Sequence, residues 1–245
     1  MNRCVKDFVK LCSATLPINE PVYEFGSRQM PGQEGYADLR VLFPEREYVG
    51  ADYIDGIGVD IVLDLQEIRL PTETVGTLIC MEVLEHVERP LDAIREMHRV
   101  LQPGGVLVIS SPMKLRIHGS PYDYWRFTPE GFRTLLKPFR QTFVGFCGDE
   151  AFPDTVIGIA VKDGEIPLDS FKENYREWQL KWSSPLPGLK RKVSQAISPY
   201  IPAMFSNSAF ELWRRHCSNP EFAKYKHLAA LCVPPIILNL LRRSK

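Results

Sequence analysis

The residue types best suited to chemistry gather in one turn, Glu82-Val83-Leu84-Glu85-His86, which holds two carboxylates and an imidazole. The apolar run Val75 to Met81 precedes this turn and predicts a buried strand, and the run Val106 to Ser110 predicts another. Between them, apolar residues at helical spacing from Pro90 to Leu101 predict a helix of about three turns. Because ligands bind outside the carboxyl ends of strands in open α/β sheets, this βαβ unit places the turn at a binding site.

Two histidines are the candidate bases, because an unperturbed imidazole titrates near neutral pH. His86 lies in the turn. His118 lies in a loop after the strand predicted from Val106 to Ser110, over the expected ligand pocket. Asp123 follows among the aromatic and charged residues 122–126, a composition expected of a lid over a polar acceptor. Structural alternatives remain: His86 bonds a neighbouring loop, Asp123 pairs with Arg126, and the loop aromatics pack on the sheet edge.

Three successive strands carry residues that suit an adenosine ligand. The strand predicted at 21–27 runs into a turn at Gly26, where the missing Cβ lets the backbone approach a ligand. Asp52 ends the strand predicted at 48–52, where a carboxylate can accept hydrogen bonds from both ribose hydroxyls. Asp64 lies at the end of a third strand, where it can accept from the amine of a purine. The chain lacks GxGxxG at this turn, so we expect an adenosine pocket without a pyrophosphate cradle.

Alternating strand and helix patterns over about 160 residues predict an α/β fold with a doubly wound, mostly parallel, Rossmann-like sheet. A helix opening at Thr128-Pro129 and final strands at 142–146 and 155–161 complete the pattern. Beyond Gly164 the strand patterns stop, and Trp, Pro and Lys become frequent. We therefore expect a main domain over 1–164 and a basic, Pro-interrupted, helical extension over 165–245.

Charge is divided unevenly along the chain, with 17 basic and 24 acidic residues in 1–164 but 13 and 6 in 165–245. The acidic main domain argues against nucleic acid as a partner, whereas the basic tail suits an anionic partner or the domain itself. The apolar segment Leu228 to Leu241 is too short to span a bilayer. It predicts either a helix hairpin packed on the core or a peripheral membrane contact aided by the basic residues that follow.

The six cysteines form no CxxC pair and have no histidine at metal-ligand spacing. Reduced structural thiols and no metal site are therefore expected. The N-terminal residues lack an apolar stretch of signal-peptide length, and no window is long and apolar enough for a spanning helix. A cytoplasmic location is the resulting expectation.

Together these features resemble the class I S-adenosylmethionine-dependent methyltransferases that carry an LEHV turn and an RVLxPGG loop, which correspond here to residues 84–87 and 99–105. The likeness covers residues 20 to 162. The segment from His118 to Thr128 is similar to a pattern in bacterial methyltransferases, some of which are associated with surface-polysaccharide synthesis. One departure is Arg28, which stands where such enzymes usually have a second glycine.

The resemblance implies S-adenosylmethionine as the cofactor and methyl transfer to a small or glycan-like acceptor, at oxygen. It implies that the Gly26 turn contacts the methionine part, Asp52 the ribose, Asp64 the adenine, and Glu82 the region of the methyl group. The full set of expected cofactor-binding residues is Glu24, Gly26, Ser27, Asp52, Tyr53, Asp64, Leu65, Glu82 and Val83. The expected catalytic residues are His118, His86 and Asp123.

Two other functions fit part of the pattern. A catalytically inactive methyltransferase-like scaffold, with the basic tail as its interaction element, would explain Arg28 in the glycine turn. A nicotinamide-dependent oxidoreductase would explain Asp52 as a ribose-binding acid, but the missing GxGxxG and the presence of Asp64 disfavour it.

Overall fold

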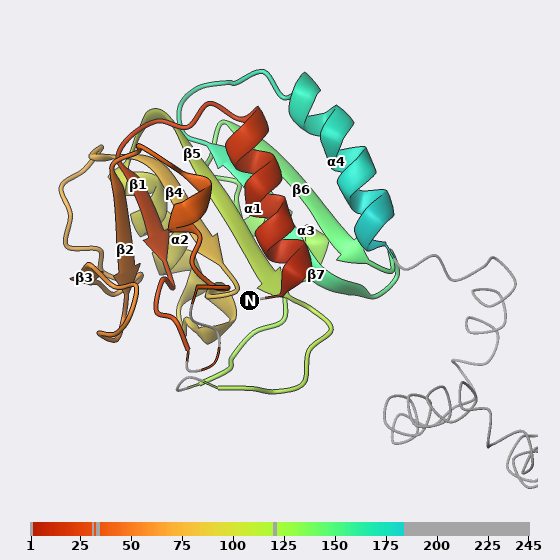
Figure 1. Ribbon diagram of the computed structural model, residues 1–245, viewed down its shortest axis with the longest axis horizontal. Helices are drawn as coiled ribbons and strands as arrows, with labels where there is room; N and C mark the ends of the chain where they lie inside the picture. The colour runs from red at the N-terminus through yellow and green to blue at the C-terminus, as the bar shows by residue number, and fades with distance from the viewer. Residues whose placement is uncertain (1, 31, 33–34, 120–121, 184–245) are drawn as a thin grey trace, which may run out of the picture. The chain divides into compact units, whose positions relative to one another are not determined.

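The computed structural model describes residues 2–30, 32, 35–119 and 122–183, which form a seven-stranded sheet with helices on both faces (Figure 1). The strand order is β3-β2-β1-β4-β5-β7-β6. Strands β1 to β5 run parallel, and β7 is antiparallel to both β5 and β6. The strands are β1 Val22–Phe25, β2 Tyr48–Asp52, β3 Ile61–Val62, β4 Val75–Met81, β5 Leu101–Pro112, β6 Gln141–Gly148 and β7 Pro153–Val161. The predicted doubly wound, mostly parallel sheet is confirmed.

Among the described residues, four α-helices cover the two faces of this sheet in pairs. Helices α1 and α4 contact each other in front of the sheet in Figure 1, whereas α2 and α3 lie behind it. The helices are α1 Arg3–Thr15, α2 Pro90–Val100, α3 Pro129–Leu135 and α4 Asp169–Trp182, with short 3-10 helices at η1 Arg40–Leu42 and η2 Leu84–His86. Thr128 caps α3 as predicted, because its hydroxyl accepts a hydrogen bond from the backbone N–H of Gly131.

Strand β4 lies at the centre of the sheet, and all its residues are buried. A strand covered on both faces needs apolar residues throughout, which is why its bounds agree with the predicted Val75 to Met81. Its neighbour β5 begins at Leu101, earlier than predicted, since this residue pairs with Val75 instead of ending α2. Most of the RVLxPGG loop at residues 99–105 therefore lies inside β5, where Gly104 has φ +76°.

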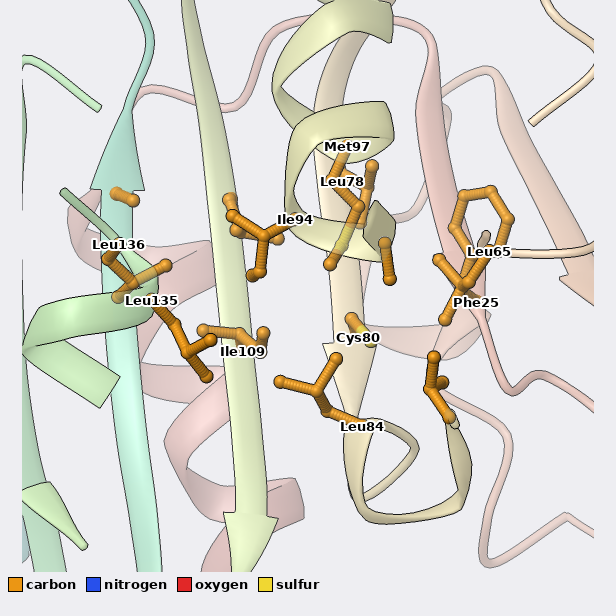
Figure 2. Close-up of a cluster of buried hydrophobic side chains, with 14 of the residues drawn as sticks. Phe25, Leu65, Leu78, Cys80, Leu84, Ile94, Met97, Ile109, Leu135 and Leu136 are labelled. Atoms are coloured by element: carbon orange, nitrogen blue, oxygen red, sulfur yellow. The ribbon is translucent and has the colours of Figure 1, made fainter. Parts of the chain in front are cut away.

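The crossover helix α2 is positioned by apolar packing on β4 and β5. Figure 2 shows Ile94 and Met97 of this helix among Leu78 and Cys80 of β4 and Ile109 of β5. Replacing a buried side chain of this size with alanine typically costs about 2 to 5 kcal/mol, so this packing holds the η2 turn in place at the end of β4.

Helix α4 packs on α1, although it lies beyond the predicted domain boundary at residue 164. The Phe8 ring lies 6.2 Å from that of Phe171 and 5.4 Å from that of Trp178, and Asp7 accepts hydrogen bonds from Lys181 and Trp182. The compact unit runs from Met1 to Ser184, so residues 165–183 lie within it and not in a separate extension. The predictions for the basic tail and for Leu228 to Leu241 lie outside the described residues. Among the helices described, none is long and apolar enough to cross a membrane.

Candidate functional site

A cavity of about 960 Å³ opens at the carboxyl ends of the parallel strands. Its lining includes every residue that the sequence predicts for cofactor binding: Glu24, Gly26, Ser27, Asp52, Tyr53, Asp64, Leu65, Glu82 and Val83. His86 and His118 also line it, but Asp123 does not. Residues spread over ninety positions of sequence thus share one cavity, because parallel strands end at the same edge of the sheet.

The turn after β1 needs a glycine for two reasons. Gly26 has φ +85°, a conformation that residues with a Cβ rarely adopt. A Cβ placed there would also lie 2.2 Å from Cγ2 of Val83, which belongs to the turn after β4. Next to it, the buried Ser27 donates its hydroxyl hydrogen to the carbonyl oxygen of Ala51 at the end of β2. The turns after β1 and β4 therefore form one closely packed wall.

Asp52 is held in place by backbone amides. Its two carboxylate oxygens accept hydrogen bonds from the N–H groups of Arg28, at 3.2 Å, and Ile54, at 3.1 Å. Each oxygen keeps a further lone pair that a ribose hydroxyl can use. Arg28 itself lines the cavity, and its side chain runs close to Gly56 in the loop after β2. This position leaves the cavity open, so the feature on which the scaffold alternative depended does not block the pocket.

Asp64 lies beyond the end of β3, which is shorter than the predicted third strand. It forms an isolated bridge with Glu67, and its Oδ1 accepts a hydrogen bond of 2.8 Å from the backbone N–H of Gln66. Leu65 is buried beside it and adds an apolar surface to the cavity. The pair thus offers a hydrogen-bond acceptor beside an apolar contact.

Glu24 is a buried carboxyl group on the floor of the cavity. Only 6% of the residue is exposed, and its Oε2 accepts a hydrogen bond of 2.6 Å from the hydroxyl of Tyr48. Burial raises the pKa of Glu24 to about 7, although the bond from Tyr48 opposes the shift. One oxygen of this residue is therefore already engaged by the protein.

Glu82 directly follows β4 and has a backbone conformation unusual for a residue with a side chain. Its φ is +55°, and its N–H donates to the carbonyl oxygen of Ser110 on β5. Its Oε1 accepts a hydrogen bond of 3.1 Å from the side chain of Asn2, which also caps α1. Burial raises the pKa of Glu82. Left-handed backbone at non-glycine residues clusters at functional sites, consistent with the place of Glu82 on the cavity wall.

Glu85 is a second buried carboxyl group, and the sequence prediction of site residues missed it. Its side chain is 0% exposed, and Oε2 accepts a hydrogen bond of 3.0 Å from Ser111. Among the described residues, Oε1 has no hydrogen-bond partner, and it lies 3.8 Å from Nε2 of His86. Burial raises the pKa of Glu85 to about 8. The signal in the sequence was an acid between Leu84 and Val87, two residues that are themselves buried.

The structure brings His86 and His118 together, with ring centroids 4.8 Å apart. Nδ1 of His86 lies 2.5 Å from the carbonyl oxygen of Tyr122, so this nitrogen carries the hydrogen and donates it. Nδ1 of His118 lies 3.1 Å from Oδ2 of Asp123. Each imidazole thus has one ring nitrogen beside a residue that follows β5, Tyr122 for His86 and Asp123 for His118.

Asp123 lies outside the cavity lining and forms an ion pair with Arg126. Its side chain is 2% exposed, and its two oxygens accept hydrogen bonds from Arg126 at 2.5 and 2.7 Å. The backbone N–H of His118 donates to Oδ2 as well. The Arg126 guanidinium holds the pKa of Asp123 well below its usual range. The pairing with Arg126 is the structural alternative that the sequence left open.

The rest of this loop is fastened to the turn that holds Glu85. The backbone N–H groups of Tyr124 and Trp125 donate to the carbonyl oxygen of Glu85, and the Trp125 indole donates to that of Val87. Tyr122 and Tyr124 nevertheless keep large exposed surfaces and line the cavity mouth. The loop is therefore attached to the turn by hydrogen bonds, whereas its tyrosine rings at the cavity mouth are exposed.

Comparisons with known proteins point to one class of enzyme. Residues 46–109, from β2 into β5, match the family model described as a methyltransferase domain. A protein of Mycolicibacterium smegmatis, named a probable S-adenosylmethionine-dependent methyltransferase, is 30% identical over 116 residues. That match covers 43% of this chain and 41% of the relative, so the chain spans about two fifths of the length of that curated relative.

Solved structures with a related arrangement include S-adenosylmethionine-dependent methyltransferases from two organisms. The protein from Archaeoglobus fulgidus is 16% identical, with 64% of this chain and 94% of that chain covered and a TM-score of 0.48. The protein from Mesorhizobium loti is 17% identical, with 64% and 98% covered and a TM-score of 0.47. The strand order and the two helix layers described above form a Rossmann-like sheet, and residues 46–109 within it match the methyltransferase-domain model.

Proposed function

We propose that this protein is an S-adenosylmethionine-dependent methyltransferase that acts on a small or glycan-like acceptor, at oxygen. The observation that carries the proposal is the shared cavity. The segment that matches the methyltransferase domain contributes Asp52, Asp64 and the turn at Glu82 to the same cavity as the glycine turn after β1. The cofactor, when bound, supplies a methyl group on a positively charged sulfur.

The cofactor half of the cavity lies over β1, β2 and β3. Asp52, already oriented by two amides, accepts hydrogen bonds from the ribose hydroxyls. Asp64 accepts from the adenine amine, and Leu65 contacts the ring. The backbone around Gly26 approaches the methionine part, which is possible because no Cβ stands there.

The acceptor half lies between the end of β4 and the loop at 115–127. Methyl transfer is an in-line displacement, so the main task of these residues is to orient the acceptor oxygen and receive its proton. His118 and His86 are the groups placed to receive that proton. The exposed rings of Tyr122 and Tyr124 at the mouth suit the apolar face of a sugar.

Asp123 acts through His118 and not on the substrate. Its carboxylate is buried, paired with Arg126, and lies 3.1 Å from Nδ1 of His118. A carboxylate in this place orients the imidazole and stabilises its protonated form. We therefore assign Asp123 a positioning role, which refines its expected place among the catalytic residues.

We also propose a cytoplasmic location and no nucleic-acid partner. The cysteines among the described residues, Cys4, Cys12, Cys80 and Cys147, form no disulfide, although the Sγ atoms of Cys4 and Cys147 lie 2.6 Å apart. A reducing compartment would keep this pair as thiols. The excess of acidic residues in 1–164 disfavours binding to a polyanion.

The test is a calorimetric titration with S-adenosylmethionine and S-adenosylhomocysteine, with NAD as the control ligand. Binding of the two sulfur compounds without binding of NAD is expected. Asp52→Ala should weaken that binding by about 1 to 3 kcal/mol, because a charged hydrogen-bond acceptor is lost. Asp55→Ala is the matched control, since among the described residues the carboxylate of Asp55 accepts a hydrogen bond from Gly56 and does not line the cavity.

A screen for transfer of a labelled methyl group should follow, with sugars, lipids and small alcohols as acceptors. Label in a methyl ether of a sugar is the expected result. If both sulfur compounds fail to bind the intact protein, or if Asp52→Ala and Asp55→Ala bind equally well, the proposed pocket assignment is wrong.

A further inference from the structure

One cluster on the cavity wall contains three side chains that could hold a metal ion. Glu85, His86 and His118 each offer one ligand atom, and the three atoms lie within 4.8 Å of one another. Glu85 and His86 come from the turn after β4, whereas His118 comes from the loop after β5. The expectation of no metal depended on cysteine spacing and could not foresee that these residues meet.

The strongest sign of a missing ligand is Oε1 of Glu85. This oxygen is completely buried and has no hydrogen-bond partner among the described residues. The other oxygen, Oε2, is held by Ser111, which fixes the carboxyl group so that Oε1 lies 3.8 Å from Nε2 of His86. Burying a carboxylate oxygen without a partner is costly, and a cation at this point would remove the cost.

The imidazole of His86 is oriented as metal ligands usually are. It donates from Nδ1 to the carbonyl oxygen of Tyr122, so Nε2 is left with a free lone pair on the side of Glu85. Nδ1 of His118 lies 3.1 Å from Oδ2 of Asp123, but it is buried and has no hydrogen-bond partner among the described residues. Backbone carbonyls and carboxylates are the common outer partners of metal-binding histidines.

The donor set indicates which kind of ion would bind. Two imidazole nitrogens and one carboxylate suit Zn²⁺ and the divalent ions of Fe, Co and Mn, whereas Mg²⁺ and Ca²⁺ prefer oxygen ligands throughout. Ligands of one such ion lie about 3 to 3.5 Å apart, so atoms at the 4.8 Å limit would need to approach by about 1.3 to 1.8 Å. Three protein ligands also leave positions open toward the cavity.

We propose that Glu85, His86 and His118 bind one divalent transition-metal ion at the acceptor end of the cavity. The open positions of the ion would take the acceptor oxygen, a step that rests on the proposed function. A metal-bound hydroxyl loses its proton to solvent more readily than a free one, so the histidines would then act through the ion and not as bases.

The experiment uses the full chain without a histidine tag, treated with a chelator and titrated by calorimetry with Zn²⁺ or Mn²⁺, with Mg²⁺ for comparison. We expect one strong site for a transition metal and much weaker binding of Mg²⁺. Glu85→Gln and His118→Asn should each weaken the site at least about tenfold. His98→Asn is the matched control, because His98 lies on α2 against Phe139, outside the cavity.

His216 and His227 remain in every variant, so any background binding to them cancels in the comparison. A thermal melt checks that each variant folds, and the partly exposed His118 carries the test if Glu85→Gln does not fold. Equal affinity of all variants, or no stoichiometric binding of any transition metal, would overturn the proposal. Titration of the same samples with S-adenosylhomocysteine separates this result from the proposed function, since the cofactor half contains none of the three ligands.

Discussion

The two halves of the cavity are held in place by different interactions. In the cofactor half, Asp52 and Asp64 are oriented by backbone amides, and Gly26 lets two turns pack closely. In the acceptor half, side chains hold side chains, as Arg126 fixes Asp123 and Asp123 lies against His118. The backbone amides are positioned by the fold itself. The charged side chains of the acceptor half instead hold one another, so the position of each depends on its neighbours. The first half should therefore resist substitution of neighbours, and the second should not.

The largest effect should come from removing α4, which packs on α1. Deletion after residue 164 uncovers Phe8 and removes Phe171 and Trp178, and α1 carries Asn2 to Glu82 in the acceptor half. We expect the fragment 1–164 to lose its cooperative thermal transition, and the fragment 1–183 to keep it. A fragment 1–164 that melts cooperatively and binds S-adenosylhomocysteine would restore the boundary predicted from sequence.

Gly26→Ala should nearly abolish cofactor binding. The added Cβ would lie 2.2 Å from Val83, and the residue would keep φ +85°, so we expect a loss of more than about 2 kcal/mol in calorimetric titration. Gly32→Ala is the control, because Gly32 also has a positive φ, +81°, but a Cβ there meets nothing within 4 Å. Equal losses in both variants would show that backbone strain, and not the packing of the two turns, dominates.

Asp123→Asn should affect the acceptor half alone. The amide cannot balance the charge of Arg126 or offer His118 the same neighbouring charge, so we expect kcat to fall at least about tenfold. The affinity for S-adenosylhomocysteine should stay within about twofold. Asp92→Asn is the control, since it breaks arginine pairs on the surface of α2. A loss of cofactor affinity in Asp123→Asn would show that the halves are not independent.

The smallest effect concerns pH and stability. The pKa of Glu85 is raised to about 8 in the folded protein, so the folded state holds a proton that the unfolded state has lost. The resulting stability is full below about pH 4 and is lost as the pH rises through about 8. The free energy of unfolding in chelator should therefore fall by more than about 1 kcal/mol between about pH 5 and pH 8.

Glu85→Gln should make that decline shallower, because the amide cannot ionise and still offers an acceptor to Ser111. Glu24 contributes with the same sign, since its pKa is raised to about 7. Glu88→Gln, at an exposed position, should leave the decline unchanged. An identical pH profile for Glu85→Gln and the wild type would show that Glu85 does not titrate in this range.

The contrast between the halves also explains what could be predicted from sequence. The strand β4 could be predicted, because a continuous apolar run identifies a buried strand. The meeting of the proposed cofactor residues in one cavity could also be predicted, because parallel strands end together. The partners of Glu85 could not, since Ser111 and His118 lie on the next strand and its loop. From the sequence, Asp123 could be either a catalytic residue or the partner of Arg126. The structure shows that it pairs with Arg126.

Helix α4 shows a different kind of error. Phe171, Tyr175 and Trp178 are spaced as one apolar helix face, and all three are buried. The change of composition after Gly164 outweighed that spacing in the sequence prediction, although a domain boundary depends on which surfaces are buried and not on composition.

The close approach of Gly26 and Val83 links the histories of two positions in the turns that follow the neighbouring strands β1 and β4. A side chain at position 26 becomes sterically possible only after position 83 has lost its branched methyl groups. If Val83→Ala comes first, the later change Gly26→Ala is destabilised only by the backbone strain at position 26. The reverse order meets the strain and the clash together. Sequence change at this wall of the cavity thus has a direction, and positions 26 and 83 are expected to change as a pair.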